Sequence, residues 1–189
     1  MKTIENTKLI KKETKFFDLI PYIFCFFTFS FLGWIMETLF CYGLLGQFVK
    51  RGFLYSPICP IYGTGALILM IYLDKSKSKN SYIKLFILFT IVFSFFEYMV
   101  GFALDALFAT RWWDYSDSTY NLNGRITLLN SFFWGVITII FTKFIYPLTQ
   151  KFKEKVINKI PSTIQIIISC ILISGITIDF TLSCIKYLR

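Results

Sequence analysis

Four carboxylates lie within stretches of the chain that are otherwise apolar: Glu37, Glu97, Asp105 and Asp179. A charged side chain at the centre of a bilayer costs about 2.5 to 3.5 kcal/mol on insertion scales, so none of them should face lipid. We therefore expect all four to face the interior of a helical bundle. Carboxyl groups in such positions bind ions or solutes, or act as general acids or bases.

Three arginines fall between the apolar runs, namely Arg51, Arg111 and Arg125. A guanidinium group can hold a carboxylate through two parallel hydrogen bonds. We predict that the arginines and the carboxylates meet in one partly buried polar cavity that opens to the outer side of the membrane. The alternative is a set of ion pairs that only clamp the helices together.

Residues 50–65, KRGFLYSPICPIYGTG, interrupt the apolar pattern. Pro57 and Pro60 argue against a continuous helix here. Non-helical backbone at membrane depth must be covered by protein or line a watery cavity, so we predict a broken or re-entrant segment that forms part of a site. The alternative is a simple outer turn. Tyr62, just after the prolines, is also a candidate.

Residues 110–125, TRWWDYSDSTYNLNGR, form an aromatic and charged loop. Trp113 and Asp114 are candidates for ligand contact, although tryptophans also collect at membrane interfaces without binding anything. The complete set of candidate substrate-binding residues is Glu37, Arg51, Pro57, Pro60, Tyr62, Glu97, Asp105, Trp113, Asp114 and Arg125.

The composition is typical of a membrane protein: 56% of the 189 residues are hydrophobic, 20% are aromatic and only 16% are charged. The chain has no histidine and its five cysteines show no C-x-x-C spacing, so we expect neither a Ser-His or Cys-His nucleophile pair nor a metal site, and we assign no cofactor. The net charge of +9 comes from clusters between apolar runs, which indicates topology and not nucleic-acid binding.

We predict an all-α polytopic membrane bundle of about five spans. A lysine-rich tail, residues 1–15, precedes a single transmembrane domain, residues 16–189. The predicted spans are 16–45, the broken segment 52–73, 85–109, 126–147 and 162–188, and residues 150–161 are a basic linker that could form a short interfacial helix.

The distribution of basic residues predicts the orientation. The tail and the two basic loops on the same side hold 14 of the 20 lysines and arginines. Because basic residues are retained on the cytoplasmic side, the N-terminus is expected in the cytoplasm and the C-terminus outside the cell membrane. The proline segment and the loop 110–125 then share the outer side.

Four blocks resemble one family. They are FSFLGWIMET (29–38), RGFLYSPICPIYG (51–63), FEYMVGFALDALFATRWWDYS (96–116) and NLNGRITLLNSFFWG (121–135). In this order they are similar to the signature blocks of the small bacterial ABC transporter permeases also called the type IV or CmpB-like group. The chain departs from that pattern at Lys50, Ser56 and Thr127, where Asn, Gly and Cys are expected. The last predicted span carries no comparable motif.

The resemblance implies a multi-pass permease subunit, which would need a separate ATPase subunit and a second copy of itself. The chain has no G-x-x-x-x-G-K-[ST] motif, so it is not expected to hydrolyse nucleotide itself. A second hypothesis is an intramembrane enzyme that acts on a lipid or envelope precursor, with Glu37, Glu97 or Asp114 as general acid or base. A third is an accessory or sensor protein. The leading hypothesis is the transport subunit.

Overall fold

The structure is a computed structural model that describes residues 2–76 and 81–188, with the backbone alone described for residues 2–18 and for residue 44. It is built almost entirely of helices, so the predicted all-α class is confirmed. The elements are α1 (Lys2–Leu45), α2 (Pro60–Lys75), α3 (Tyr82–Phe108), β1 (Asn121–Leu122), β2 (Ile126–Thr127), α4 (Leu128–Ile140), a π-helical turn (Phe141–Ile145), α5 (Tyr146–Lys155), a 3₁₀ turn (Ile157–Lys159) and α6 (Ser162–Tyr187).

Within the described residues, four helical stretches are long and apolar enough to cross a membrane: Leu19–Gly43, Tyr82–Phe108, Leu128–Lys159 and Ser162–Tyr187. Helix α2, with 16 residues, is shorter than the roughly 20 that a straight span needs. It follows an irregular segment, residues 46–59, so the predicted proline-containing region is a short helix preceded by non-helical backbone.

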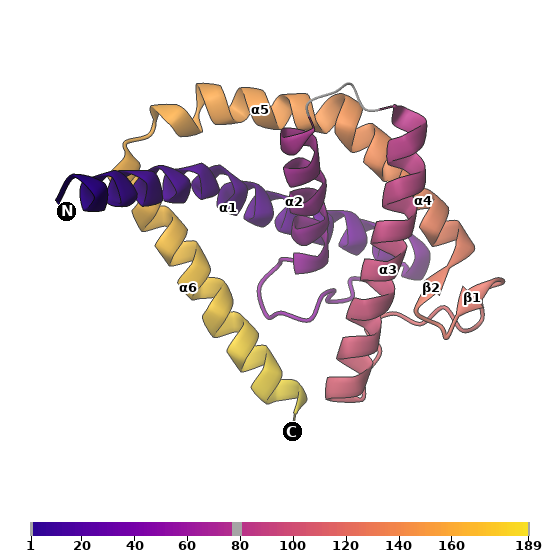
Figure 1. Cartoon of the computed structure of the whole chain (residues 1–189). Coiled ribbons are helices and arrows are strands. Elements are labelled where there is room, and N and C mark those ends of the chain that lie inside the picture. Colours follow the sequence, from indigo (N-terminus) through magenta and orange to yellow (C-terminus); the bar gives the residue numbers. More distant parts are fainter. Residues whose placement is uncertain (1, 77–80, 189) are drawn as a thin grey trace.

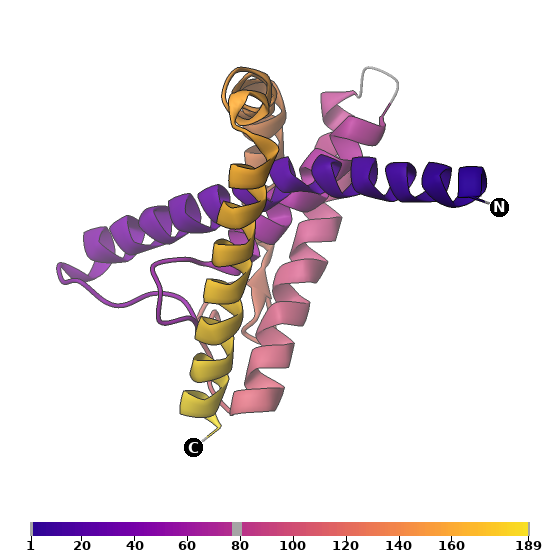
Figure 2. The same cartoon turned by 90° about the vertical axis from the view of Figure 1, so that its left-hand side faces the viewer.

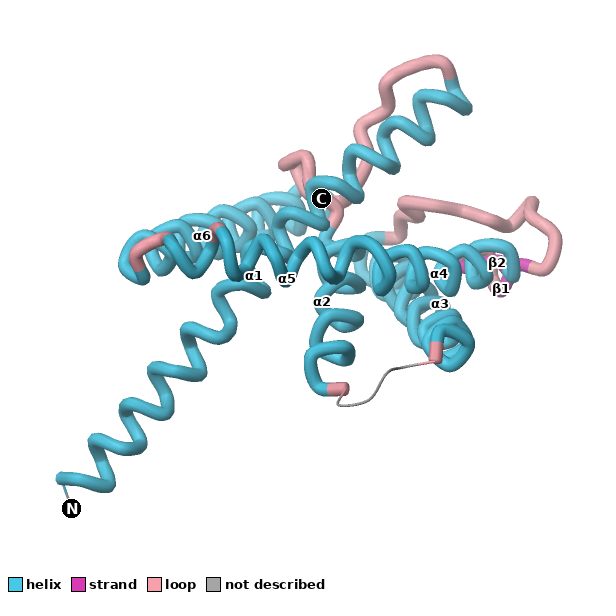
Figure 3. The backbone as a smooth tube through the Cα atoms, turned by 90° about the horizontal axis from the view of Figure 1, so that it is seen from above, coloured by secondary structure: helices cyan, strands magenta, loops and turns pink. Residues whose placement is uncertain are grey.

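The helices do not all run in the same direction. Helices α2 and α3 stand upright in Figure 1 and α6 runs obliquely, whereas α1 crosses α2 and α3 at a steep angle, as the turned view in Figure 2 confirms. Helix α5 lies across one end of the molecule above α2, and the C-terminal end of α6 lies near the far end of α3. Figure 3 shows the N-terminal part of α1 extending away from the other helices. The predicted tail therefore belongs to the same helix as the first predicted span, and its side chains lie outside the described residues.

Glycines bring the helices together in two pairs, α1 with α2 and α3 with α4. A Cβ on Gly63 would lie 2.5 Å from the carbonyl oxygen of Phe26 and would also collide with Ser30 of α1. Gly33 gives the same close approach from the other side, where a Cβ would overlap the ring of Tyr62. Small residues of this kind allow the backbones of two helices to pack closely within a membrane.

An aromatic and aliphatic core joins the two helix pairs. Phe89 and Phe93 of α3 are buried against Leu69 and Met70 of α2, and Phe141 of the π-helical turn completes the cluster. This core fixes the side of α3 that faces α2. Ser94, Glu97, Gly101 and Asp105 form a polar stripe along α3 that leads toward the loop that follows it.

The fourth predicted span differs from the structure at both ends. Ile126 and Thr127 pair with Asn121 and Leu122 in a short antiparallel ribbon, and α4 begins only at Leu128. The Thr127 hydroxyl accepts a hydrogen bond from the Asn130 N–H and caps the helix. At the other end, the predicted linker helix is a continuation of α4 through the π-helical turn. Such turns bend helices, which explains the change of direction seen in Figure 1.

Asp74 ties the end of α2 to two other helices. Its carboxylate accepts hydrogen bonds from the hydroxyl of Tyr22 in α1 and from the hydroxyl of Tyr146 in α5. Gln150 Nε2 of α5 donates a third hydrogen bond over 2.9 Å. The predicted second span ends at residue 73, whereas the structure continues α2 through Asp74 to Lys75.

Candidate functional site

Glu37 and Arg51 form an ion pair between α1 and the irregular segment. The Nη2 and Nε atoms of Arg51 lie 2.9 and 3.2 Å from Oε1 of Glu37. Both donors therefore bond to one carboxylate oxygen, in place of the predicted fork over two. Each side chain is 23% exposed, so the pair is partly buried.

The irregular segment is folded so that the other oxygen of Glu37 also has a partner. Cys59 Sγ donates to Oε2 of Glu37 over 3.6 Å, and the Cys59 N–H bonds to the Ser30 carbonyl oxygen of α1 over 2.9 Å. Gly52 has a φ of +86°, and a Cβ there would lie 3.0 Å from Cys59 Sγ, so the turn requires glycine. The result is a Glu37 carboxylate with both oxygens occupied.

Glu97 of α3 is the most buried of the four carboxylates, with 6% of its surface exposed. Oε2 accepts a hydrogen bond from Trp134 Nε1 of α4 over 2.5 Å, and Oε1 accepts one from the Tyr115 hydroxyl over 3.3 Å. Among the described residues no lysine or arginine forms an ion pair with it. Burial and the nearby Glu97 raise the pKa of Tyr115, so its hydroxyl stays protonated and able to donate.

Asp105, one turn before the end of α3, forms a second ion-pair cluster. Arg125 Nη2 lies 2.6 Å from Oδ2 of Asp105, and Arg111 Nε lies 3.5 Å from the same oxygen. Arg111 also bonds to Asp114 through Nη1, over 3.1 Å. The guanidinium of Arg125 lies over the rings of Tyr98 and Phe102. This cluster holds the loop 110–125 against the end of α3.

The loop itself is ordered by short-range hydrogen bonds. The Ser116 hydroxyl and N–H both donate to Asp114 Oδ1, and these bonds hold the pKa of Asp114 below its usual value. Gly124, with a φ of +69°, packs directly on Asp114 and Ser116, where a Cβ would collide. Trp113 Nε1 donates to the Arg125 carbonyl oxygen over 3.0 Å. These contacts therefore hold the part of the loop that carries Trp113, Asp114 and Tyr115 in one conformation.

These elements surround a polar cavity of about 520 Å³. Six of the ten candidate residues line it, and Asp105 and Arg125 lie outside it, in the neighbouring cluster. Pro57 lines neither this cavity nor the apolar one described next, and Pro60 starts α2. The polar cavity is lined by Glu37, Phe40, Cys41, Arg51, Ile61, Tyr62, Glu97, Arg111, Trp112, Trp113, Asp114, Tyr115 and Trp134.

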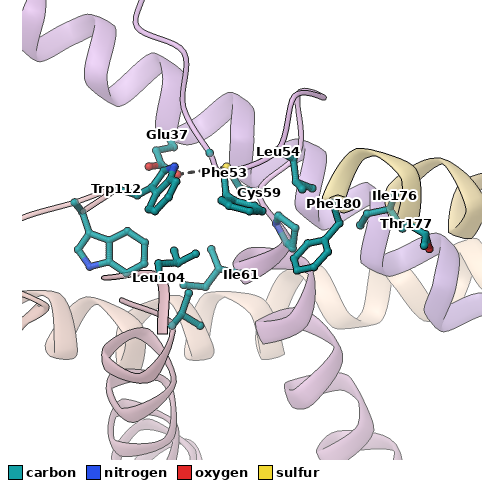
Figure 4. A pocket seen from close by; sticks show the side chains of 14 residues that line it. Glu37, Phe53, Leu54, Cys59, Ile61, Leu104, Trp112, Ile176, Thr177 and Phe180 are labelled. Carbon is teal, nitrogen blue, oxygen red and sulfur yellow. Dashed lines mark hydrogen bonds between the residues drawn. The ribbon is translucent and has the colours of Figure 1, made fainter. Parts of the chain in front are cut away.

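An apolar cavity of about 430 Å³ adjoins the polar one, and the two share Glu37, Ile61, Trp112 and Trp113. Figure 4 shows Glu37 and Cys59 joined by their hydrogen bond at one side of the apolar cavity, with apolar side chains from the other elements around it. These include Phe53 of the irregular segment, Leu104 of α3, and Ile176 and Phe180 of α6.

Asp179 has a separate role. Its two carboxylate oxygens accept hydrogen bonds from the backbone N–H groups of Tyr55 and Ser56, each over 2.8 Å. Ser183, one turn further along α6, also donates to it over 3.2 Å. Asp179 lines neither the polar nor the apolar cavity, so it anchors the irregular segment to α6.

Sequence analysis missed several residues of this site. Tyr115 and Trp134 donate to Glu97, and Cys59 donates to Glu37. The contact of Trp134 could have been predicted in part from the sequence, because an indole N–H within an apolar run needs a hydrogen-bond acceptor and a buried carboxylate is a good one.

The fold and the site define an all-α membrane protein with acidic and basic side chains gathered among apolar helices. A comparison with protein families agrees: the family described as "Putative ABC-transporter type IV" matches residues 24–184. The chain belongs to this family. The match includes α6, which carried no recognised motif. No curated protein and no solved structure matches the chain in the corresponding comparisons.

Proposed function

We propose that this chain is the membrane-embedded subunit of a transporter and that the polar cavity binds the transported solute. One observation carries the proposal: Glu97 is buried, its donors among the described residues are the neutral Tyr115 and Trp134, and it lies on a cavity that also contains the Glu37–Arg51 pair. Intramembrane carboxylates without an ionic partner are expensive to retain, and they commonly mark a pathway for ions or solutes.

The family supports a transporter of the ABC type, which obtains its energy from ATP. Because the chain lacks a nucleotide-binding motif, the proposal includes a separate ATPase subunit and a second copy of this chain. The orientation predicted from the basic residues places the N-terminus in the cytoplasm, the C-terminus outside the cell membrane, and the mouth of the polar cavity on the outer side.

The test begins with the tagged chain purified from native membranes in mild detergent. An ATPase should copurify, and the reconstituted complex should hydrolyse ATP faster when the solute is present. Glu97→Gln should abolish the stimulation by solute. Glu154→Gln is the matched control, because Glu154 is an exposed carboxylate on α5 and undergoes the same change of charge.

A purely structural role for Glu97 would give a different result. If Glu97→Gln lowered the melting temperature of the complex and left the solute-stimulated ATPase rate unchanged, the carboxylate would be structural and the proposal would fail. Turnover of a lipid by the chain alone, without ATP, would support the enzyme hypothesis in its place.

A further inference from the structure

The polar and the apolar cavity meet at a wall that both of them share. Glu37, Ile61, Trp112 and Trp113 contribute to the lining of each. Beyond this wall, the polar cavity holds the other charged groups and the apolar cavity holds Phe53, Leu104 and Phe180. Each volume is within the usual range for a small-molecule site, roughly 300 to 1,000 Å³. A molecule that occupied both would need a polar head and an apolar chain.

The charges of the polar cavity show what kind of head it would accept. The lining includes three carboxylates, Glu37, Glu97 and Asp114, but only two guanidinium groups. Arg51 is occupied by Glu37, and Arg111 is shared between Asp105 and Asp114. Within the described part of the chain, Glu97 is thus the acidic group left without a cation, and the complementary ligand group carries positive charge.

The aromatic residues support the same conclusion. Five residues with an aromatic face and a polar tip line the polar cavity: Tyr62, Trp112, Trp113, Tyr115 and Trp134. Trp134 and Tyr115 both bond to Glu97, so at least two of these rings lie next to the unpaired carboxylate. Rings gathered around a carboxylate attract ammonium groups, particularly alkylated ones, through the negative potential of the ring face.

We propose that the two cavities form one binding site for an amphipathic cation, with its ammonium head beside Glu97 and one alkyl chain in the apolar cavity. The inference deepens the proposed function and rests on it, because it assigns a chemical class to the transported solute. An anionic amphipath is disfavoured because both lining guanidinium groups already have carboxylate partners.

Binding is measured on the purified chain in maltoside micelles, without ATP or any partner. Three probes are titrated while tryptophan fluorescence is recorded: decyltrimethylammonium, decyl sulfate and tetramethylammonium. The proposal predicts saturable binding of decyltrimethylammonium, at least about tenfold tighter than binding of either other probe. Glu97→Gln should weaken decyltrimethylammonium binding by at least about tenfold. Glu154→Gln, which changes the net charge equally, should leave binding unchanged.

A second variant tests the apolar cavity, where the alkyl chain of the ligand is proposed to lie, and does not depend on Glu97. Leu104→Trp places an indole in the apolar cavity, so it should weaken decyltrimethylammonium binding and leave tetramethylammonium binding unchanged. If Glu97→Gln is not recovered folded, this comparison decides alone. Equal binding of the sulfate and the ammonium, or equal loss in Glu97→Gln and Glu154→Gln, or no effect of Leu104→Trp would overturn the proposal. Because no ATPase is involved, failure here is distinguishable from failure to find a transport partner.

Discussion

Trp134 Nε1 of α4 donates a hydrogen bond to Oε2 of Glu97 in α3 over 2.5 Å. This contact joins the two helices at the most buried acidic group of the four that lie in apolar runs. It also sets one boundary of the polar cavity, since both residues line it. Its removal should therefore affect stability as well as ligand binding.

Trp134→Phe keeps an aromatic ring and removes the donor. Leaving a buried carboxylate oxygen without its partner should cost about 1 to 3 kcal/mol of stability, measured as thermal unfolding in detergent. Adding Glu97→Gln to this variant should cost less than Glu97→Gln does in the unmodified chain, because the shared hydrogen bond is already lost. Simple additivity of the two changes would show that the contact is not energetically coupled.

Arg51→Gln breaks the ion pair with Glu37 and leaves a partly buried carboxylate. Because each side chain is 23% exposed, the expected loss lies between that of a surface pair and that of a buried one, about 1 to 2 kcal/mol. Arg51→Lys should retain only part of the stability that Arg51→Gln loses, since the pair uses two donors of one guanidinium group. The double variant Glu37→Gln with Arg51→Gln should be more stable than Arg51→Gln alone. Denaturation midpoints check the order, and a double variant that is the least stable would contradict it.

Asp114 in the loop 110–125 should make the thermal stability of the protein depend on pH. Asp114 has a lowered pKa because Ser116 donates to it twice and Arg111 lies beside it. The ordinary value is about 3.9, so the ionised Asp114 stabilises the fold above that pH, and the contribution disappears as the pH falls through the lower folded value.

The melting temperatures of the unmodified chain and of Asp114→Asn should therefore converge as the pH is lowered from about 6 to about 3. Ser116→Ala removes the hydroxyl donor, so it should raise the pKa of Asp114 and shrink the difference already at neutral pH. A difference between the unmodified chain and Asp114→Asn that does not change with pH would argue against this assignment.

Gly63→Ala tests the crossing of α1 and α2. The added methyl group would collide with Ser30 and with the Phe26 carbonyl oxygen, so the helices must separate, at a cost of about 1 to 3 kcal/mol. Gly43→Ala is the control. Apart from its chain neighbours and the local helix backbone, no described atom lies within 4 Å of a Cβ at Gly43, and alanine is the better helix former by up to about 1 kcal/mol. Thermal unfolding should show opposite signs for the two variants, and equal effects would remove the argument for close packing.

Part of this architecture could be predicted from residue types alone. The apolar runs predicted the helical membrane class, and the cost of placing a charged side chain in lipid indicated that Glu97 faces inward. Pro57 and Pro60 indicated the interruption between α1 and α2. Each of these follows from local composition and periodicity.

The partners of the charged groups could not be predicted in the same way. Trp134 is 37 residues from Glu97, and Asp179 contacts the backbone of Ser56 across 123 residues, so only the packing of the helices brings them together. The predicted common cavity joined Asp105 and Arg125 to Glu37 and Arg51. In the structure the ribbon of β1 and β2 holds Arg125 beside Asp105 and away from the Glu37–Arg51 pair, and no periodicity in the sequence indicates that ribbon.

The continuous helix formed by α4, the π-helical turn and α5 connects two distant polar centres. At one end Trp134 bonds to Glu97, and at the other Tyr146 and Gln150 bond to Asp74. Because one helical element carries all three donors, it sets the position of Trp134 at the cavity together with the positions of Tyr146 and Gln150 at the end of α2.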